Sequence, residues 1–385
     1  MRPRSGSLVP MAILVALACA GAAPPDAFDT AFRFATAIEA DPNDQAMAQE
    51  RVVSGLIALG RLDEAGQRAA TIKGWRKGTT CADLARSWAE KGRPDKARDY
   101  LDQAEAARRA ATDWGGPRIA AHMAEALAVL GDVERATSLA AQLASDDPRQ
   151  YGGRAAAAVA GGLAQTGDFA GAMARLRTLD NERDFDVAWW RTTGYRDLAR
   201  RPGLTPAERA EALRAARVSA DGVSGWKRGE ALVDIARESL KRDDPAAARE
   251  ALVTAEEVIA PLPPTLPVKA SLMSDLAEAW DLRKETGRAR RLLQRAEKET
   301  PAAAVIDRPG ALAAIAGARW AIGDKAAARA LYDRGLSEAE ALVNARPRAL
   351  AAVDICLSLG KNDVALAPEV RTRLEALYTG LRDPW

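Results

Sequence analysis

The sequence predicts an all-α protein, folded as an α-solenoid of about nine helical hairpins. Three observations lead to this fold class. A small residue is followed seven positions later by Gly or a polar turn residue, then five positions later by Ala, and this spacing recurs along nearly the whole chain. Its fixed period indicates a repeat array rather than a globule around one buried site. The composition, rich in Ala, Leu and charged residues with 5% aromatic residues, favours helices packed closely on helices.

The small residue that opens each copy defines nine anchor positions. They are residues 53, 85, 124, 160, 199, 236, 277, 316 and 353, with a mean spacing of about 37.5 residues. The clearest copies are Ala85–Gly92–Ala97, Ala124–Gly131–Ala136, Ala160–Gly167–Ala172 and Ala316–Gly323–Ala328. Other turn residues occur in Ala236–Asp243–Ala248 and Ala277–Lys284–Ala289. Val53–Gly60–Ala65 and Val353–Gly360–Ala365 are end copies, and Ala199 opens a degraded copy.

Each unit is predicted to be a helix hairpin. The first helix carries a large apolar residue just before the anchor, and Gly ends this helix because it accepts left-handed backbone. Asp then caps the second helix by accepting its free amide hydrogens, as in Gly131-Asp132, Gly167-Asp168 and Gly323-Asp324. Ala five positions after the turn lets the two helices approach closely. Longer connectors with Pro at 201–206 and 261–264 are predicted to be rigid, with a hinge between two halves as the alternative.

The N-terminal residues are predicted to be a signal peptide that covers 1–22 and leaves a single repeat array over 23–385. Arg2 and Arg4 precede an apolar run, and Ala20-Gly21-Ala22 fits a cleavage site. Cys19 offers a lipid anchor as an alternative, and an uncleaved anchor or no export stays open. The mature chain is predicted to have no transmembrane segment, because no later stretch is long and uncharged enough. We therefore expect a periplasmic or extracellular protein, and the Ala-rich composition suggests a bacterial source.

The chemistry-bearing residues are few. The net charge of +2 gives no sign of a nucleic-acid partner. His122 is the only His, so triads with His and two-His metal sites are excluded, and no Gly-rich phosphate loop or Cys-x-x-Cys is present. The sequence thus predicts no enzyme, cofactor or metal. Cys81 and Cys356 lie in apolar helical patterns and are expected to be small buried residues near opposite ends of an extended array.

The spacing of small residue, turn Gly and Ala resembles the tetratricopeptide repeat (TPR) family. The large apolar residue before the first small one matches Leu84, Ile235 and Leu276, and the inter-repeat Pro matches Pro148 and Pro301. The resemblance covers residues 30 to 380, although these units are longer than the family's 34 residues and mostly lack its Trp. It implies a right-handed superhelix whose first helices line a concave groove that binds peptides or proteins.

Polar residues recur on the first helices beside the anchors. Two positions before the anchor stand Asp83, His122, Asp197, Asp234 and Asp275, and one position after it stand Arg86, Glu125, Arg200, Arg237 and Glu278. The resemblance implies that these positions face the groove and contact ligands. Alternatively, Asp and Arg three residues apart pair on one helix and give a neutralised surface.

An aromatic residue stands ten positions before several anchors. These residues are Trp75, Trp114, Trp189 and Trp226, with Tyr151 one residue out of step. One interpretation is that each staples its unit to the next. The other is an exposed Trp edge, with Arg and Lys nearby, that stacks on sugars or an acidic peptide. The sequence therefore predicts an exported scaffold or adaptor that binds a protein or peptide. A carbohydrate- or cell-wall-binding module and a purely structural spacer are the alternatives.

Overall fold

The computed structural model describes residues 26–39, 41–112, 114–146, 151–179 and 185–381, and within these ranges every regular element is a helix. This confirms the predicted all-α solenoid. The predicted signal peptide, Cys19 and Pro148 lie outside the described residues. No helix in the described ranges is both long enough and apolar enough to cross a membrane.

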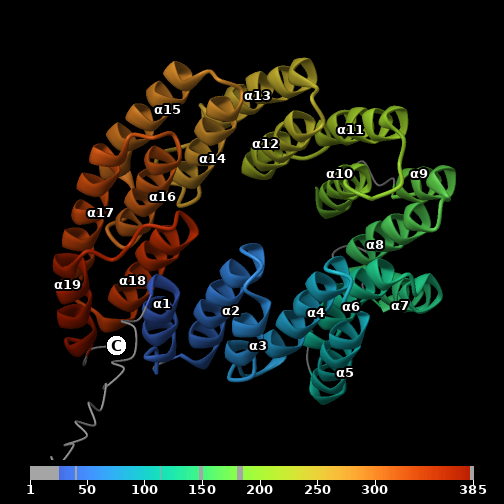
Figure 1. Cartoon of the computed structure of the whole chain (residues 1–385), viewed down its shortest axis with the longest axis horizontal. Coiled ribbons are helices and arrows are strands. Elements are labelled where there is room, and N and C mark those ends of the chain that lie inside the picture. The colour runs from blue at the N-terminus through green and yellow to red at the C-terminus, as the bar shows by residue number, and fades with distance from the viewer. Residues whose placement is uncertain (1–25, 40, 113, 147–150, 180–184, 382–385) are drawn as a thin grey trace, which may run out of the picture.

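Two layers of helices alternate along the described chain. The first helices are α2 (Pro42–Ala58), α4 (Trp75–Glu90), α6 (Gly115–Leu130), α8 (Tyr151–Gln165), α10 (Phe185–Ala199), α12 (Gly225–Lys241), α14 (Lys269–Leu282), α16 (Arg308–Ala321) and α18 (Ala345–Lys361). The second helices are α3 (Leu62–Ala69), α5 (Pro94–Ala110), α7 (Val133–Asp146), α9 (Phe169–Arg177), α11 (Pro206–Ala220), α13 (Pro245–Ile259), α15 (Thr286–Glu299), α17 (Lys325–Glu340) and α19 (Pro368–Thr379). Helix α1 (Ala27–Thr36) precedes the array, and η1 (Thr300–Ala302) follows α15. Each first helix packs on its own second helix and on the next first helix, so the first helices form the inner layer (Figure 1).

The anchors hold the hairpins together. All nine lie on first helices, and every one of them is 0% exposed. Their small side chains let neighbouring helices approach closely, which is why the spacing could be detected in the sequence. The predicted turn chemistry is confirmed where Gly131 ends α6 at φ 81° and where the Asp168 carboxylate accepts from the Gly171 amide at 2.8 Å. Asp324 departs from this pattern, because it pairs with Arg319 at 2.7 Å instead of capping α17.

The last unit departs from the predicted spacing. Gly360 is still helical, as the last but one residue of α18, and Asp363 takes the positive φ of 50° three residues later. Ala365 consequently lies in the connector before α19, where it is exposed. The turn of this hairpin is therefore displaced by three residues, and Gly360 does not form it.

Helix α1 joins the two ends of the array. It packs on α2 and on α18, and α2 and α18 also contact each other directly, so the solenoid closes into a ring (Figure 1). The array is thus not extended, contrary to the expectation from the repeat pattern. Phe28 fills the junction and is 1% exposed. A Cβ on Gly360 would lie 2.6 Å from the Phe28 ring, and a Cβ on Gly55 would lie 2.8 Å from it.

Polar and aromatic contacts reinforce this seam. Arg33 on α1 pairs with Glu375 on α19 at 2.7 Å, and Phe34 meets Tyr378 edge-on with 5.4 Å between ring centroids. Further ion pairs join α2 to the last unit, namely Arg51 with Asp354 and Arg346 with Asp44. The seam is therefore formed by apolar, aromatic and ionic contacts from four helices, α1, α2, α18 and α19.

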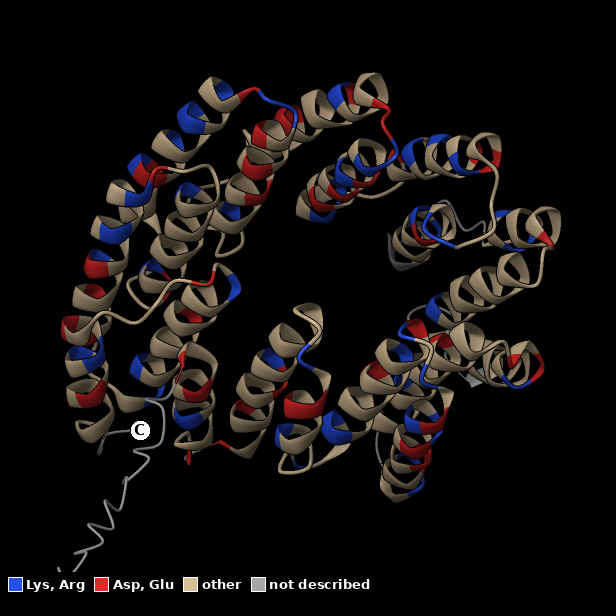
Figure 2. Cartoon of the chain, in the orientation of Figure 1, with Lys and Arg blue, Asp and Glu red and all other residues tan. Residues whose placement is uncertain are grey.

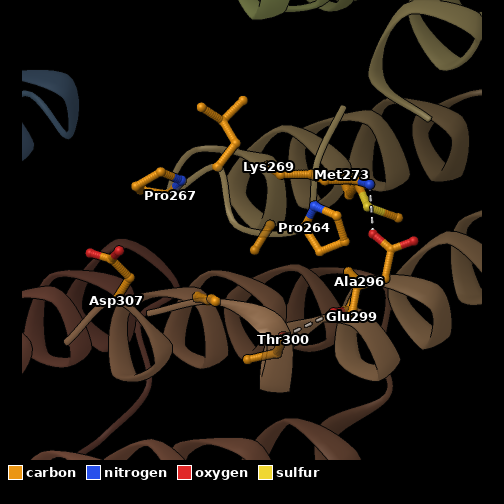
Figure 3. A pocket seen from close by; sticks show the side chains of 12 residues that line it. Pro264, Pro267, Lys269, Met273, Ala296, Glu299, Thr300 and Asp307 are labelled. Carbon is orange, nitrogen blue, oxygen red and sulfur yellow. Dashed lines mark hydrogen bonds and ion pairs between the residues drawn. The ribbon is translucent and has the colours of Figure 1, made fainter. Parts of the chain in front are cut away.

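Lys269 holds the connector at 261–268 in place, and Figure 3 shows its ion pair with Glu299. Lys269 is 3% exposed, donates to the Leu262 carbonyl at 2.5 Å and pairs with Glu299 at 2.7 Å. The cavity beside it, of about 10 Å³, has room for one water at most. These contacts favour the rigid connector over the hinge.

Candidate binding surface inside the ring

A cavity of about 910 Å³ lies on the inner side of the first helices, between α2 and α12. Its walls come from α2, α4, α6, α8, α10 and α12, together with the residues just after α10. Six cationic side chains and three carboxylates line this cavity: Arg86, Arg154, Arg196, Arg200, Arg201 and Lys241, with Glu90, Glu125 and Asp197. We call it the basic cavity.

A second inner cavity, of about 480 Å³, lies between α2, α14, α16 and α18. Its charged residues have the opposite balance, with four carboxylates and two cations: Asp275, Glu278, Asp307 and Asp354, with Arg51 and Lys361. We call it the acidic cavity. Both signs of charge occur on the inner helices in Figure 2. The inside of the ring is therefore polar and electrostatically asymmetric.

The predicted groove residues of units two and three form one largely buried cluster with Arg154 of unit four. The Asp83 carboxylate lies 2.9 Å from His122 Nδ1, and Arg154 contacts the other ring nitrogen of His122. Arg154 donates to Glu125 at 2.6 Å, and Arg86 donates to the same carboxylate at 3.2 Å. Three adjacent first helices, α4, α6 and α8, are joined by these contacts.

The charges of this cluster hold its carboxylates ionised. Burial alone would raise the pKa of Glu125, but Arg154 and Arg86 outweigh it and lower the pKa to about 2. The pKa of Asp83 is likewise held well below its usual range, because His122, Arg86 and Arg154 outweigh burial. The cluster is thus a salt-bridge network and offers no neutral acid for proton transfer.

A second network joins α10 to α12. Arg200, the first residue after α10, pairs with Asp197 of that helix at 3.1 Å and with Glu238 of α12 at 3.0 Å. Arg196 pairs with Asp197 at 2.9 Å and also with Asp234. Glu238 is 1% exposed, so the pairing with Arg200 compensates a carboxylate that is removed from water.

A third network joins α12 to α14. Arg237 pairs with Asp275 at 2.9 Å and with Glu278 at 3.1 Å. Burial outweighs this pairing for Glu278 and raises its pKa above the usual range. The acidic and basic residues beside the anchors therefore neutralise one another, as the second interpretation expected, but with different partners. The partners mostly stand on adjacent helices, and the predicted pairing of Asp and Arg three residues apart occurs between Asp197 and Arg200 at the end of α10.

The structure thus distributes the ten predicted groove residues. Arg86, Glu125, Asp197 and Arg200 line the basic cavity, whereas Asp275 and Glu278 line the acidic cavity. The other four, Asp83, His122, Asp234 and Arg237, line neither cavity and serve in the networks between helices. Sequence reasoning missed Arg154, Arg196 and Arg201. In the unit anchored at Ala160, Arg154 lies one helical turn before the predicted groove position, which is two residues ahead of the anchor. That spacing could have identified Arg154 from the sequence.

Two of the aromatic residues at the helix entries, Trp75 and Trp114, lie against each other. The ring centroids of Trp75 and Trp114 are 4.8 Å apart, which links neighbouring units as a staple would. Arg76 and Arg118 stand over the Trp75 ring at 4.4 and 4.6 Å. Trp114 is 55% exposed, whereas Trp75 is half-buried.

The other aromatic residues of this set are less open. Lys227 stands 5.4 Å from the Trp189 ring and 5.9 Å from the Trp226 ring, and both Trp residues are half-buried. Tyr151 is 7% exposed and belongs to the core. The set therefore does not form one continuous exposed edge, and Trp114 is its most accessible member.

The metal-ligand residue types and the two cysteines are two further kinds of chemistry-bearing group in the described ranges. No group of three or more His, Cys, Asp or Glu residues there is arranged to hold a metal ion. Cys81 and Cys356 are buried free thiols, and burial raises their pKa values to about 11 and about 12. The prediction that both behave as small buried residues is confirmed.

Comparison with known proteins leaves the family open. No family model matches the chain, and no curated protein matches it. Among solved structures, it is similar to Ton1535 from Thermococcus onnurineus NA1, at 13% identity and a TM-score of 0.24, over 79% of this chain and 92% of that one. It is also similar to a circular tandem repeat protein with novel repeat topology, at 13% identity and a TM-score of 0.26, over 91% and 93%. Such scores assign neither family nor function, and the resemblance to tetratricopeptide repeats stays a prediction.

Proposed function

We propose that this chain is an exported ring-shaped scaffold that binds a segment of a protein partner on the inner face of its first helices. The observation that carries the proposal is the pair of cavities inside the ring. Together they are lined mainly by first-helix residues, including six of the ten polar positions predicted to face a ligand.

The size and chemistry of the two cavities favour a polypeptide. A volume of about 910 Å³ lies at the upper end of the range for small-molecule sites, and the acidic cavity adds a second contact region. A polypeptide segment can present carboxylates to one cavity and ammonium groups to the other. A nucleic acid would bring phosphates toward Asp275, Glu278, Asp307 and Asp354, which is unfavourable.

The networks between helices support a scaffold role. Each joins adjacent units on the inner layer, so the polar groups there are held in position before a ligand arrives. Preorganisation of this kind lowers the entropy cost of binding. Export rests on the predicted leader at residues 1–22 and belongs to the proposal.

A carbohydrate-binding role is the second candidate, favoured by the exposure of Trp114. Sugars stack on open aromatic faces, and Trp114 is 55% exposed. The guanidinium groups over Trp75 occupy the neighbouring stacking position, so the geometry supports this role less well. Binding of cell-wall glycan by the chain, and its loss in Trp114→Ala, would favour it over the scaffold. A spacer would show no ligand in either assay.

Photo-crosslinking from inside and outside the ring tests the proposal. A benzoylphenylalanine residue is placed at Lys241 in the basic cavity, at Lys361 in the acidic cavity, or at Arg290 on the outer helix α15. All three positions are exposed, so the reporter is tolerated equally. After irradiation in envelope extract, the same partner protein should be captured from Lys241 and Lys361 and not from Arg290. Capture from Arg290 alone, or from none of the three, would contradict the proposal.

A further inference from the structure

We propose that Arg201 is the anion-contact residue of the basic cavity, which takes an acidic segment of the partner, with side-chain carboxylates as the recognised groups. This inference rests on the proposed function and deepens it, since it names the chemistry of the bound segment. It starts from the one cavity cation that the networks leave unpaired.

Five of the six cations in the basic cavity have carboxylate partners. Arg86 and Arg154 share Glu125, Arg196 and Arg200 share Asp197, and Lys241 lies 3.7 Å from Glu238. Among the described residues, no hydrogen bond or ion pair reaches the guanidinium of Arg201, and its Nε is buried without a partner. A buried donor that lacks an acceptor costs free energy, which a bound carboxylate would recover.

The position of Arg201 is set by a missing side chain. Arg201 follows α10 directly, and its guanidinium lies on α8 over Gly161. A Cβ on Gly161 would stand 2.6 Å from Arg201 Nη2. The guanidinium thus packs against α8 at Gly161, and Arg201 lines the cavity together with Trp190 and Arg154.

The nearby carboxylates do not replace a ligand. Asp197 is already engaged by Arg196 and Arg200, and Glu90 is exposed at the end of α4 beyond ion-pair distance. Burial lowers the pKa of Arg201 although both carboxylates act in the opposite sense. A carboxylate bound in the cavity could form charge-assisted hydrogen bonds with Arg201, and Arg200 and Arg86 line the same cavity.

An acidic peptide fits this site better than a nucleic acid. The whole chain carries only +2, and the acidic cavity shares the same interior. Phosphate recognition along a strand needs several unpaired cations in a row, whereas Arg201 stands alone. A peptide with carboxylates spaced along it can place one of them on the unpaired guanidinium of Arg201. Its other carboxylates can approach the neighbouring Arg side chains, which already have ion-pair partners.

Fluorescence anisotropy of short labelled peptides tests the inference with the full chain. The probes are a peptide of alternating Glu and Gly, the same peptide with Lys, the same with Gln, and a single-stranded oligonucleotide. The Glu peptide should bind and the others should not, and binding should weaken as salt is added. Arg201→Gln should weaken binding about tenfold, the loss expected for one charge-assisted contact. Arg290→Gln, which removes an exposed charge from α15, should leave binding unchanged.

A variant without a change in charge tests whether the position of the Arg201 guanidinium, and not only the net charge of the chain, determines binding. Gly161→Ala keeps every charge but places a Cβ against Arg201 Nη2, so it should also weaken binding of the Glu peptide. Gly335→Ala is the matched control, because its nearest neighbour atom would be 3.5 Å away. Circular dichroism of both variants checks that the helices are intact.

The outcomes are distinguishable from failure of the proposed function. Binding of the Glu peptide that Arg201→Gln weakens supports the inference. No binding, equal binding by Arg201→Gln, or preferred binding of the oligonucleotide overturns it. If the crosslinked partner is captured from inside the ring and the Glu peptide still does not bind, the scaffold stands and this inference alone is wrong.

Discussion

The ring of Phe28 lies directly against the backbone of Gly360, at the point where a side chain would begin. A Cβ there would be 2.6 Å from the Phe28 ring, which is closer than carbon atoms approach. Phe28 belongs to α1, before the repeats, and Gly360 belongs to α18, the last first helix. This contact is therefore one of those that join the two ends of the solenoid.

Gly360→Ala should destabilise the closed ring. The helix itself would favour Ala over Gly by about 1 kcal/mol, but the added methyl group collides with Phe28 and should cost about 1–3 kcal/mol. The free energy of unfolding in urea measures the balance. Gly335→Ala, which adds a methyl group to helix α17 without a close contact, should be neutral or stabilising. Equal effects of the two substitutions would show that the seam does not depend on Gly360.

Arg237→Ala should destabilise the chain more than loss of an outer Arg does. Arg237 is the shared partner of Asp275 and Glu278, so its removal leaves two carboxylates close together on α14. We expect a loss of about 1–3 kcal/mol in the free energy of unfolding. Arg290→Ala on α15 should change it by less than about 0.5 kcal/mol. If both variants unfold at the same urea concentration, the network between α12 and α14 has no stabilising role.

Acid should remove the stability that Glu125 contributes. Its pKa is lowered from 4.5 to about 2 in the fold, so this contribution is fully present above pH 4.5 and is lost as pH falls toward 2. The contribution is on the order of 3 kcal/mol, because each pKa unit corresponds to about 1.4 kcal/mol. Glu125→Gln should unfold more easily at neutral pH and show a smaller fall in stability over this window. Parallel curves for the two chains would assign the acid sensitivity to other carboxylates.

Cys81 and Cys356 should resist thiol reagents in the folded chain. Both are 1% exposed or less, and their raised pKa values leave little thiolate at neutral pH. Mass spectrometry after treatment with iodoacetamide should find both unmodified, and both modified once urea is added. Modification of Cys356 without urea would indicate that α18 separates readily from its neighbours.

The sequence was a good guide to the repeating part of the fold. Small anchors such as Ala85 and Ala236 are spaced by the period of the hairpins, so helix pairing and layer order could be predicted from them. The closure of the ring could not be predicted in this way. It depends on Phe28, which precedes the repeats, and on the contact of Phe28 with Gly360, a residue that the period assigns to a turn. The displaced turn at Asp363 has the same origin, since Gly360 serves the seam.

The candidate site could be predicted only in part. The positions beside the anchors do lie on the inner layer, and Arg86 and Arg200 do line a cavity. Arg200 does pair with Asp197 as the spacing indicates, but Glu125 as partner of Arg86 and Glu238 as second partner of Arg200 were missed. Both glutamates stand on the next helix, and contacts of that kind do not follow from spacing along one helix. Arg201 could not be recognised from sequence at all, because its lack of a partner is a property of the assembled cavity.

The most direct test of the account is a map of where an acidic peptide lies on the ring. A Glu-Gly peptide that carries a photoreactive group is bound to the chain, irradiated and located by mass spectrometry of the crosslinked fragments. The account predicts crosslinks in α8, in α10 and in the residues just after it, around Arg201, with far fewer in Arg201→Gln. Crosslinks concentrated on outer helices such as α15, or a map unchanged by Arg201→Gln, would contradict the claim that the ring binds its partner from within.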